Sequence, residues 1–164
     1  MRSALRSLFL ALSFLALTVL GVPSAVQAAP TEFRTSAGTF ADGDMSNHTF
    51  TVTVGGIPRT MNASYGKPGY ETPAGTYPVM SKHRSIVFDS ATIGIPKGSS
   101  EYYYINGEWA LRLTSGGVFI HSAPWSVDSQ GYANVSHGCL NLSPEDAQWV
   151  YNVLDVGDPV TLHW

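Results

Sequence analysis

The chain has 164 residues, and 9 Lys and Arg against 12 Asp and Glu leave a formal net charge of −3 at pH 7. This mildly acidic balance argues against nucleic acid and anionic lipid as partners. Only 13% of the residues are charged, and 16 Gly and 10 Pro are typical of a small β-rich domain outside the cytoplasm. A single cysteine excludes an internal disulfide, so the domain must depend on its hydrophobic core.

The beginning of the chain has the pattern of a secretory signal peptide. Two arginines precede an apolar run, Leu8–Leu20, and Val26-Gln27-Ala28 places small residues where a cleavage site needs them. The alternative is a transmembrane anchor, but the run is shorter than the roughly 20 apolar residues that cross a bilayer. We therefore predict a signal peptide over residues 1–28 and secretion across the cytoplasmic membrane.

A short tether is expected over residues 29–44, and the main domain over residues 45–164. His48–Val54 alternates and is rich in β-branched residues, which predicts a strand with one buried face. Gly55-Gly56 is a hairpin turn signal, and Arg59–Ser64 is the expected return strand.

The middle of the chain is expected to combine short strands with one long loop. Thr72–Tyr77 predicts a turn leading into a strand that ends near Met80, and Ser85–Asp89 predicts another strand. The pattern then dissolves over Ser90–Gly107, and long irregular stretches in small domains are often lids or binding loops. A merely tolerated surface insertion is the alternative, but three consecutive tyrosines in this stretch favour a lid.

The last part of the chain contains the clearest helix. Gly116–His121 predicts a strand that ends at a histidine, and an irregular segment follows over Ser122–Val135. Ser143–Leu154 begins with a serine N-cap and a proline, and its apolar residues recur at helical spacing. Val160–Leu162 predicts a final strand. The sequence thus indicates a mostly-β domain with one helix directly after its cysteine.

Cys139 needs an explanation, because a lone thiol in a secreted protein is either inert, paired with another molecule, or kept for its reactivity. Gly138 permits a turn that aims backbone N–H groups at one point, as an oxyanion hole requires. A thiol nucleophile also needs a proton acceptor, most often histidine. His121 is preferred because a strand end positions a catalytic group rigidly. His137, two residues from the cysteine, is as consistent with a structural role, and a buried inert thiol remains the alternative reading of Cys139.

The segment between these residues resembles the signature of the L,D-transpeptidase catalytic domain family, also called YkuD. The pattern is a histidine, here His121, then a spacer of fourteen residues, then Ser136-His137-Gly138-Cys139-Leu140-Asn141. This motif is long and specific, and it differs from the Cys and His arrangements of sortases and unrelated cysteine peptidases.

Other stretches agree with this resemblance. Thr72–Tyr77 is similar to the family's Thr-Pro-x-Gly-x-Tyr turn, and Phe119–Ser126 and Asn134–Asp146 look like the actinobacterial, mycobacterial-type branch. The resemblance covers roughly residues 48–162. It implies that residues 45–164 form the catalytic domain, with a mostly-β, YkuD-like sandwich or barrel and one helix after the cysteine loop.

The resemblance implies a peptidoglycan L,D-transpeptidase that acts in the periplasm or cell wall, in cell wall biogenesis and remodelling. Its thiol attacks the amide between the third residue of a donor tetrapeptide stem and the terminal D-Ala, and a thioacyl-enzyme forms. The side-chain amine of an acceptor stem then gives a 3→3 cross-link. No metal or other cofactor is implied, a monomer is expected, and carbapenem β-lactams are the expected covalent inhibitors.

The resemblance also implies roles for individual positions. Cys139 matches the nucleophile, His121 the general base, and Ser122 the residue whose backbone carbonyl orients the imidazole. Supporting and oxyanion positions match four residues of the motif, Ser136, His137, Gly138 and Asn141. The substrate-facing wall and lid match Phe88, Tyr102, Tyr103 and Trp125.

Other functions stay open at this point. The same site with water as acceptor gives an L,D-carboxypeptidase, and a different acceptor allows attachment or release of a protein on the wall. A non-catalytic wall-binding module with an inert thiol is a third alternative. It predicts that Cys139→Ala leaves function intact and that the thiol is slow to alkylate.

Overall fold

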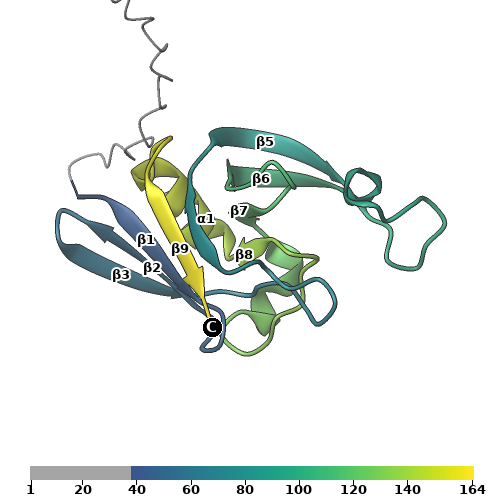
Figure 1. Cartoon of the computed structure of the whole chain (residues 1–164), viewed down its shortest axis with the longest axis horizontal. Coiled ribbons are helices and arrows are strands. Elements are labelled where there is room, and N and C mark those ends of the chain that lie inside the picture. Colours follow the sequence, from purple (N-terminus) through teal and green to yellow (C-terminus); the bar gives the residue numbers. More distant parts are fainter. Residues whose placement is uncertain (1–37) are drawn as a thin grey trace, which may run out of the picture. The chain divides into compact units, whose positions relative to one another are not determined.

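The computed structural model describes residues 38–164, so the predicted signal peptide and most of the predicted tether lie outside the described residues. Residues 38–164 form nine strands in two sheets, one α-helix and two short 3₁₀ helices (Figure 1). The mostly-β prediction with one helix after the cysteine is confirmed. Within this part of the chain, no helix is long and apolar enough to span a bilayer.

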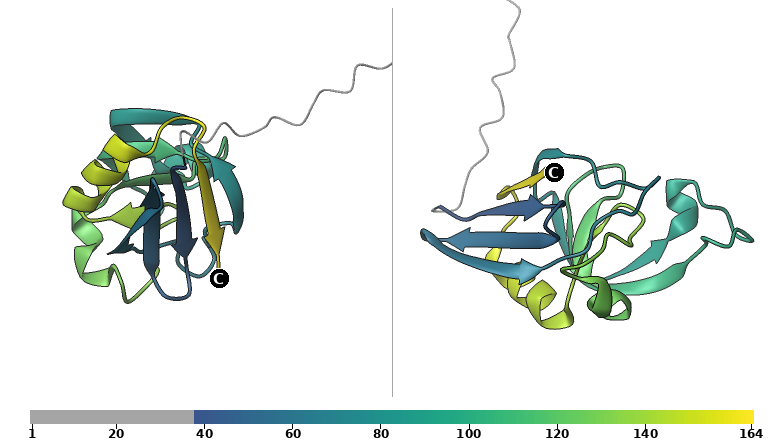
Figure 2. Two further views of the ribbon diagram at one scale, coloured as in Figure 1. Left: turned by 90° about the vertical axis from the view of Figure 1, so that its left-hand side faces the viewer. Right: turned by 90° about the horizontal axis from the view of Figure 1, so that it is seen from below.

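The first sheet joins both ends of the described chain. Within residues 38–164 it has five strands in the order β3-β2-β1-β9-β4 (Figure 2). Their bounds are β1 Phe40–Asp44, β2 Thr49–Val54, β3 Ile57–Asn62, β4 Gly75–Pro78 and β9 Pro159–His163. β2 and β3 form the hairpin expected around Gly55 and Gly56. β9 pairs parallel to β1 and antiparallel to β4, so this sheet depends on long-range pairing.

Strand β1 corrects the predicted boundary between tether and domain. The expected tether extended to Asp44, but Phe40–Asp44 pairs with β2 and β9, so the folded domain begins before residue 45. The inward positions of β1 are small. Ala41 is buried, and a Cβ on Gly43 would lie only 2.7 Å from Leu162 Cδ2. The small inward residues let the backbone of β1 lie close to its neighbours. The strand therefore lacks the alternation of large apolar and polar residues from which a strand is predicted.

The second sheet contains the predicted site. Within residues 38–164 it has four strands in the order β5-β6-β7-β8. Their bounds are β5 Ser81–Asp89, β6 Tyr104–Arg112, β7 Phe119–Ser122 and β8 Leu140–Leu142. The expectation that residues 104–107 are irregular is wrong, because β6 begins at Tyr104. The connection is residues 90–103, called the β5–β6 loop below, and Figure 1 shows it projecting from the body of the domain.

The α-helix packs against the second sheet. α1 spans Pro144–Val153, and Ser143 Oγ accepts a hydrogen bond from Asp146 N at 3.1 Å, as the predicted N-cap requires. Ala147 and Val150 are fully buried, and α1 packs on β6 and β7. One apolar core draws on both sheets and the helix, with Phe50, Val52, Ile120, Leu140, Leu142, Val150 and Leu162 among its members. β7 and β8 are therefore held rigidly by the core, and they fix the positions of their side chains that point away from it.

Candidate active site

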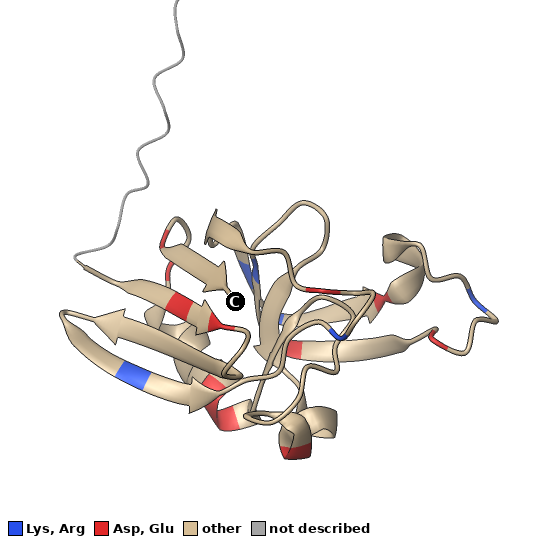
Figure 3. Cartoon of the chain, turned by 60° about the horizontal axis from the view of Figure 1, so that its bottom comes forward, with Lys and Arg blue, Asp and Glu red and all other residues tan. Residues whose placement is uncertain are grey.

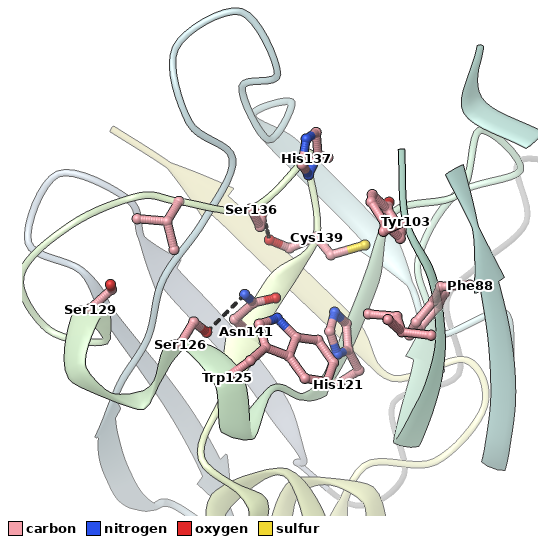
Figure 4. A pocket seen from close by; sticks show the side chains of 12 residues that line it. Phe88, Tyr103, His121, Trp125, Ser126, Ser129, Ser136, His137, Cys139 and Asn141 are labelled. Carbon is pink, nitrogen blue, oxygen red and sulfur yellow. Dashed lines mark hydrogen bonds between the residues drawn. The ribbon is translucent and has the colours of Figure 1, made fainter. Parts of the chain in front are cut away.

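The pairing of β7 with β8 brings together residues that are far apart in the sequence. His121 pairs with Asn141, and Cys139 lies two positions before Asn141. Side chains two residues apart on an extended segment point to the same face, and paired residues share that face. The three residues accordingly line one cavity of about 340 Å³ (Figure 4). The register of two short parallel strands therefore builds the predicted Cys and His pair.

His121 is buried, and one hydrogen bond determines which of its nitrogens carries the proton. Nδ1 lies 2.8 Å from the backbone carbonyl oxygen of Ser122. A carbonyl can only accept, so Nδ1–H donates, and Nε2 keeps its lone pair in the neutral ring. Burial lowers the pKa of His121 from its ordinary value to about 4, and the bond to Ser122 opposes the shift. His121 is therefore a neutral imidazole with an available Nε2 at pH 7.

Cys139 is half-buried, and its thiol is protonated in this environment. Its Sγ donates a weak hydrogen bond to the Gly117 carbonyl oxygen at 3.6 Å. Burial raises the pKa of the Cys139 thiol to about 11, and a backbone hydrogen bond from Phe119 opposes the shift. Together with neutral His121, this describes a neutral thiol and imidazole pair at pH 7 rather than a preformed thiolate and imidazolium pair.

The motif loop, residues 136–139, is held by an internal hydrogen bond network. Ser136 Oγ donates to the Cys139 carbonyl oxygen at 2.6 Å and accepts from Gly138 N at 3.1 Å. Gly138 has φ of 113°, a conformation that strongly favours glycine. The Gly138 N–H is thus bonded to Ser136 in this structure. The predicted oxyanion role of Gly138 N–H requires this bond to be exchanged for one to the substrate.

A second anchor comes from Thr72, in the turn before β4. Its buried hydroxyl donates to the Gly138 carbonyl oxygen at 3.0 Å and accepts from Gly66 N at 2.8 Å. Gly66 has no room for a side chain, since a Cβ there would lie 1.9 Å from the Tyr70 carbonyl oxygen. The motif loop is therefore fixed from both sides, by Ser136 within it and by Thr72 across from it.

Asn141 has a supporting position beneath the cavity. Its Nδ2 donates to Ser126 Oγ at 3.0 Å (Figure 4), and Ser126 Oγ donates in turn to the Ala123 carbonyl oxygen at 3.3 Å. Gln130 Nε2 donates to the same carbonyl at 3.3 Å. This buried chain ties β8 to the 3₁₀ segment Pro124–Ser129 that follows β7. It fixes the orientation of the Asn141 amide in the cavity that Cys139 also lines.

Aromatic side chains form the walls of the cavity. The Phe88 ring lies 4.7 Å from the His121 ring and the Trp125 ring lies 5.9 Å from it, measured between centroids. Trp125 is 54% exposed and stands at the mouth. Tyr103 lines the cavity beside Cys139, and burial raises the pKa of this phenol to about 12, so it remains neutral.

Cys139 also lines a second cavity, of about 230 Å³. Four residues line both cavities, namely Phe88, Tyr103, His137 and Cys139. Tyr102 was predicted to face the substrate, but it is not among the residues that line either of these cavities. Tyr103, which was also predicted to face the substrate, lines both cavities.

Several residues of the site could not be identified from sequence patterns alone. Ser126 and Thr72 lie in stretches that support the family resemblance, but their hydroxyl contacts depend on folding. Lys67 and Glu101 are ordinary surface residues in the sequence, yet Glu101 Oε2 lies 2.5 Å from Lys67 Nζ and 2.6 Å from His137 Nε2. His137 therefore has a bonded partner that its place in the motif does not reveal.

The electrostatic character of the site comes from a few individual groups. In the view of Figure 3, the acidic and basic residues are scattered singly over both sheets and the loops. Among residues 38–164, no group of three or more His, Cys, Asp or Glu side chains is arranged to hold a metal ion.

The sequence matches a known family over most of its length. Residues 39–162 match the L,D-transpeptidase catalytic domain, YkuD. The chain is 53% identical over 129 residues to L,D-transpeptidase 1 of Mycobacterium tuberculosis H37Rv, and the match covers 78% of this chain and 51% of that protein. The chain thus spans about half the length of this curated relative.

Solved structures agree with the sequence match. An L,D-transpeptidase in complex with imipenem is 52% identical, with a TM-score of 0.75, over 76% of this chain and 58% of the other. An L,D-transpeptidase from Mycobacterium smegmatis is 51% identical, also with a TM-score of 0.75, over 77% of this chain and 58% of the other.

Proposed function

This chain belongs to the YkuD family of L,D-transpeptidase catalytic domains, and we propose that it is a peptidoglycan L,D-transpeptidase with Cys139 as nucleophile and His121 as general base. One observation carries the assignment of roles. The thiol and an imidazole whose Nε2 is available line the same cavity, on two paired strands that the core holds rigid.

The first half of the reaction forms a thioacyl-enzyme. The donor is a tetrapeptide stem, whose third-residue carbonyl carbon is attacked by Cys139 Sγ while the thiol proton moves to His121 Nε2. The tetrahedral intermediate collapses, the C–N bond to D-Ala breaks, and the imidazolium returns the proton to the leaving amine. Backbone N–H groups of the motif loop stabilise the oxyanion, each contributing on the order of 3 kcal/mol.

The second half transfers the acyl group to an amine. The side-chain amine of an acceptor stem attacks the thioester carbon, and His121 Nε2 accepts the proton that the amine loses. The C–S bond breaks and the thiol recovers a proton from the imidazolium, which leaves a 3→3 cross-link. Because both half-reactions start from a neutral thiol or amine and a neutral imidazole, the protonation states of Cys139 and His121 suit the reaction at pH 7.

The proposal extends to location and inhibitors. Peptidoglycan lies outside the cytoplasmic membrane, so the signal peptide predicted over residues 1–28 fits secretion to the periplasm or cell wall. The relative solved with imipenem shares 52% identity, and we expect carbapenems to acylate Cys139 here. Donor and acceptor stem peptides are the proposed partners.

Mass spectrometry of the products tests the proposal. Purified residues 29–164 are incubated with a disaccharide-tetrapeptide, with Cys139→Ala in parallel. The expected product is a dimer lighter than two monomers by one D-Ala, and its fragments should identify a 3→3 link that the variant does not make. Tripeptide alone indicates a carboxypeptidase. Unchanged substrate together with a thiol that does not react with imipenem overturns the enzymatic proposal in favour of a binding module.

A further inference from the structure

Glu101 joins three segments of the chain at one carboxylate oxygen. Its Oε2 lies 2.5 Å from Lys67 Nζ and 2.6 Å from His137 Nε2. Glu101 belongs to the β5–β6 loop, Lys67 to the segment between β3 and β4, and His137 to the motif loop. The side chains of Lys67 and His137 are 28% and 17% exposed, so this cluster is partly shielded from water.

The charge on Glu101 determines the arrangement of protons in the cluster. The hydrogen bond from Lys67, followed by that from His137, holds the pKa of Glu101 below its ordinary value. A carboxylate can only accept, so both neighbours donate and the proton of His137 resides on Nε2. Its Nδ1 is then the acceptor whenever the ring is neutral. Glu101 thus orients an imidazole in the motif loop and selects its tautomer.

The cluster also places the aromatic wall of the site. The His137 ring contacts two tyrosines, with its centroid 4.7 Å from that of Tyr70 and 5.1 Å from that of Tyr103. Tyr103 comes two residues after Glu101 and lines both cavities around Cys139. A displacement of Glu101 therefore moves Tyr103 relative to the thiol.

The β5–β6 loop has few other polar attachments. Within the described chain, its remaining hydrogen bonds stay inside the loop and the adjoining end of β5, as in Ser90 N to the Tyr103 carbonyl oxygen at 3.0 Å. Those bonds shape the loop but do not tie it to the motif loop. The two bonds at Glu101 Oε2 make that connection.

We propose that Glu101 is a positioning residue for the transpeptidase reaction, which ties the β5–β6 loop to the motif loop through Lys67 and His137 and so places Tyr103 against the donor stem. This inference rests on the proposed function, because the consequence of a misplaced wall is weaker donor binding. Glu101 acts through Tyr103 and His137 and has no direct part in the bond-forming steps.

The first test compares Glu101→Gln with a matched control. Glu108→Gln makes the same chemical change on β6, where the carboxylate is exposed, pairs with Arg84 at 3.1 Å and lines neither cavity. Steady-state kinetics with the disaccharide-tetrapeptide should show that Glu101→Gln raises KM for the donor roughly tenfold, since a wall misplaced by about 1 Å is costly. The kcat should change less than about threefold, and the control should match the wild type.

Variants of Lys67 test whether Glu101 acts through its hydrogen bond network or through its own side chain alone. Lys67→Met should reproduce the rise in KM, and the double variant should be no worse than either single variant because both changes break one network. Lys67→Arg keeps the cation and should restore most of the donor affinity. Additive effects, or equal loss of kcat with unchanged KM, overturn the positioning role.

Hydrogen exchange tests the connection without relying on activity. Amides of residues 97–103 should exchange at least about fivefold faster in Glu101→Gln than in the wild type and in Glu108→Gln, because a local opening that costs less free energy is visited more often. Unchanged exchange overturns the proposed tie even if catalysis is impaired. If the wild type makes no cross-linked product, the proposed function fails separately, and the exchange result still decides whether Glu101 holds the loop.

Discussion

The two sides of the thiol differ in how they are held. On the side of β7, β8 and the motif loop, His121, Ser136 and Asn141 are buried, and each has a hydrogen bond partner. On the side of the β5–β6 loop, Phe88 and Tyr103 are partly exposed, and among the described residues Glu101 supplies the hydrogen bond that ties the loop to the motif loop. The residues proposed for proton transfer belong to the first side, and the aromatic wall residues Phe88 and Tyr103 belong to the second.

This difference indicates a division of labour. Proton transfer needs distances held to a fraction of an ångström, which packed strands provide. A wall that admits and releases long stem peptides has to move, and loops with few buried contacts open at low free energy. We therefore expect substitutions on the rigid side to lower kcat and substitutions on the loop side to raise KM.

The largest effect expected within this comparison comes from the proposed base, His121. His121→Gln removes Nε2 as a proton acceptor, and the tetrapeptide reaction should slow about 10³-fold in kcat, as is typical of a lost general base. The KM for the donor should change little, which quenched-flow or steady-state kinetics can measure. A large rise in KM with preserved kcat would contradict the division of roles.

Thr72→Val tests whether the hydrogen bonds that hold the motif loop are needed for stability and catalysis. The substitution leaves the Gly138 carbonyl and the Gly66 N–H without their partner, so the free energy of unfolding should fall by about 1–3 kcal/mol. The motif loop should relax, and kcat should fall by up to about 10²-fold. Thr76→Val is the control for kcat, because Thr76 Oγ1 makes an exposed hydrogen bond to Thr161 Oγ1 at 3.0 Å on the first sheet. Urea titration and steady-state kinetics provide the two measurements.

The pH dependence of Cys139 alkylation tests whether the thiol and the His121 imidazole are both neutral at pH 7. Because the pKa of Cys139 is raised to about 11, only a small fraction is thiolate at pH 7, and that fraction grows as pH rises. The rate constant for iodoacetamide should therefore rise about tenfold per pH unit between pH 7 and 10. A rate that is already flat from pH 6 upward would indicate a preformed thiolate, and would require a different first step.

Gly107→Ala is expected to have the smallest effect, and on the loop side. A Cβ at Gly107 would lie 2.1 Å from Phe88 Cε2, so the Phe88 ring, now 4.7 Å from the His121 ring, has to shift. The KM for the donor should rise about fivefold, since the wall shifts while the base remains in place. Gly116→Ala is the control, because its added Cβ meets nothing closer than 3.7 Å. A loss confined to kcat would place Phe88 with the rigid side instead.

The sequence by itself determined the features that depend on short, local residue patterns. The cysteine motif, the histidine upstream of it, the helix with its Ser143 cap and the hairpin at Gly55 and Gly56 are local patterns, and the structure has the helix and hairpin where they were predicted. The match of residues 39–162 confirms the family resemblance that rested on the motif.

Tertiary structure alone decided how distant segments complete the site. β8 has three residues, too few to show an alternating pattern, and it exists because β7 and the core hold it. The inward residues of β1 are small, so its pairing with β9 leaves little apolar signal. The partners of Gly138 and His137, Thr72 and Glu101, lie 66 and 36 residues away. Contacts over such separations leave no local pattern, because they arise only when the chain packs.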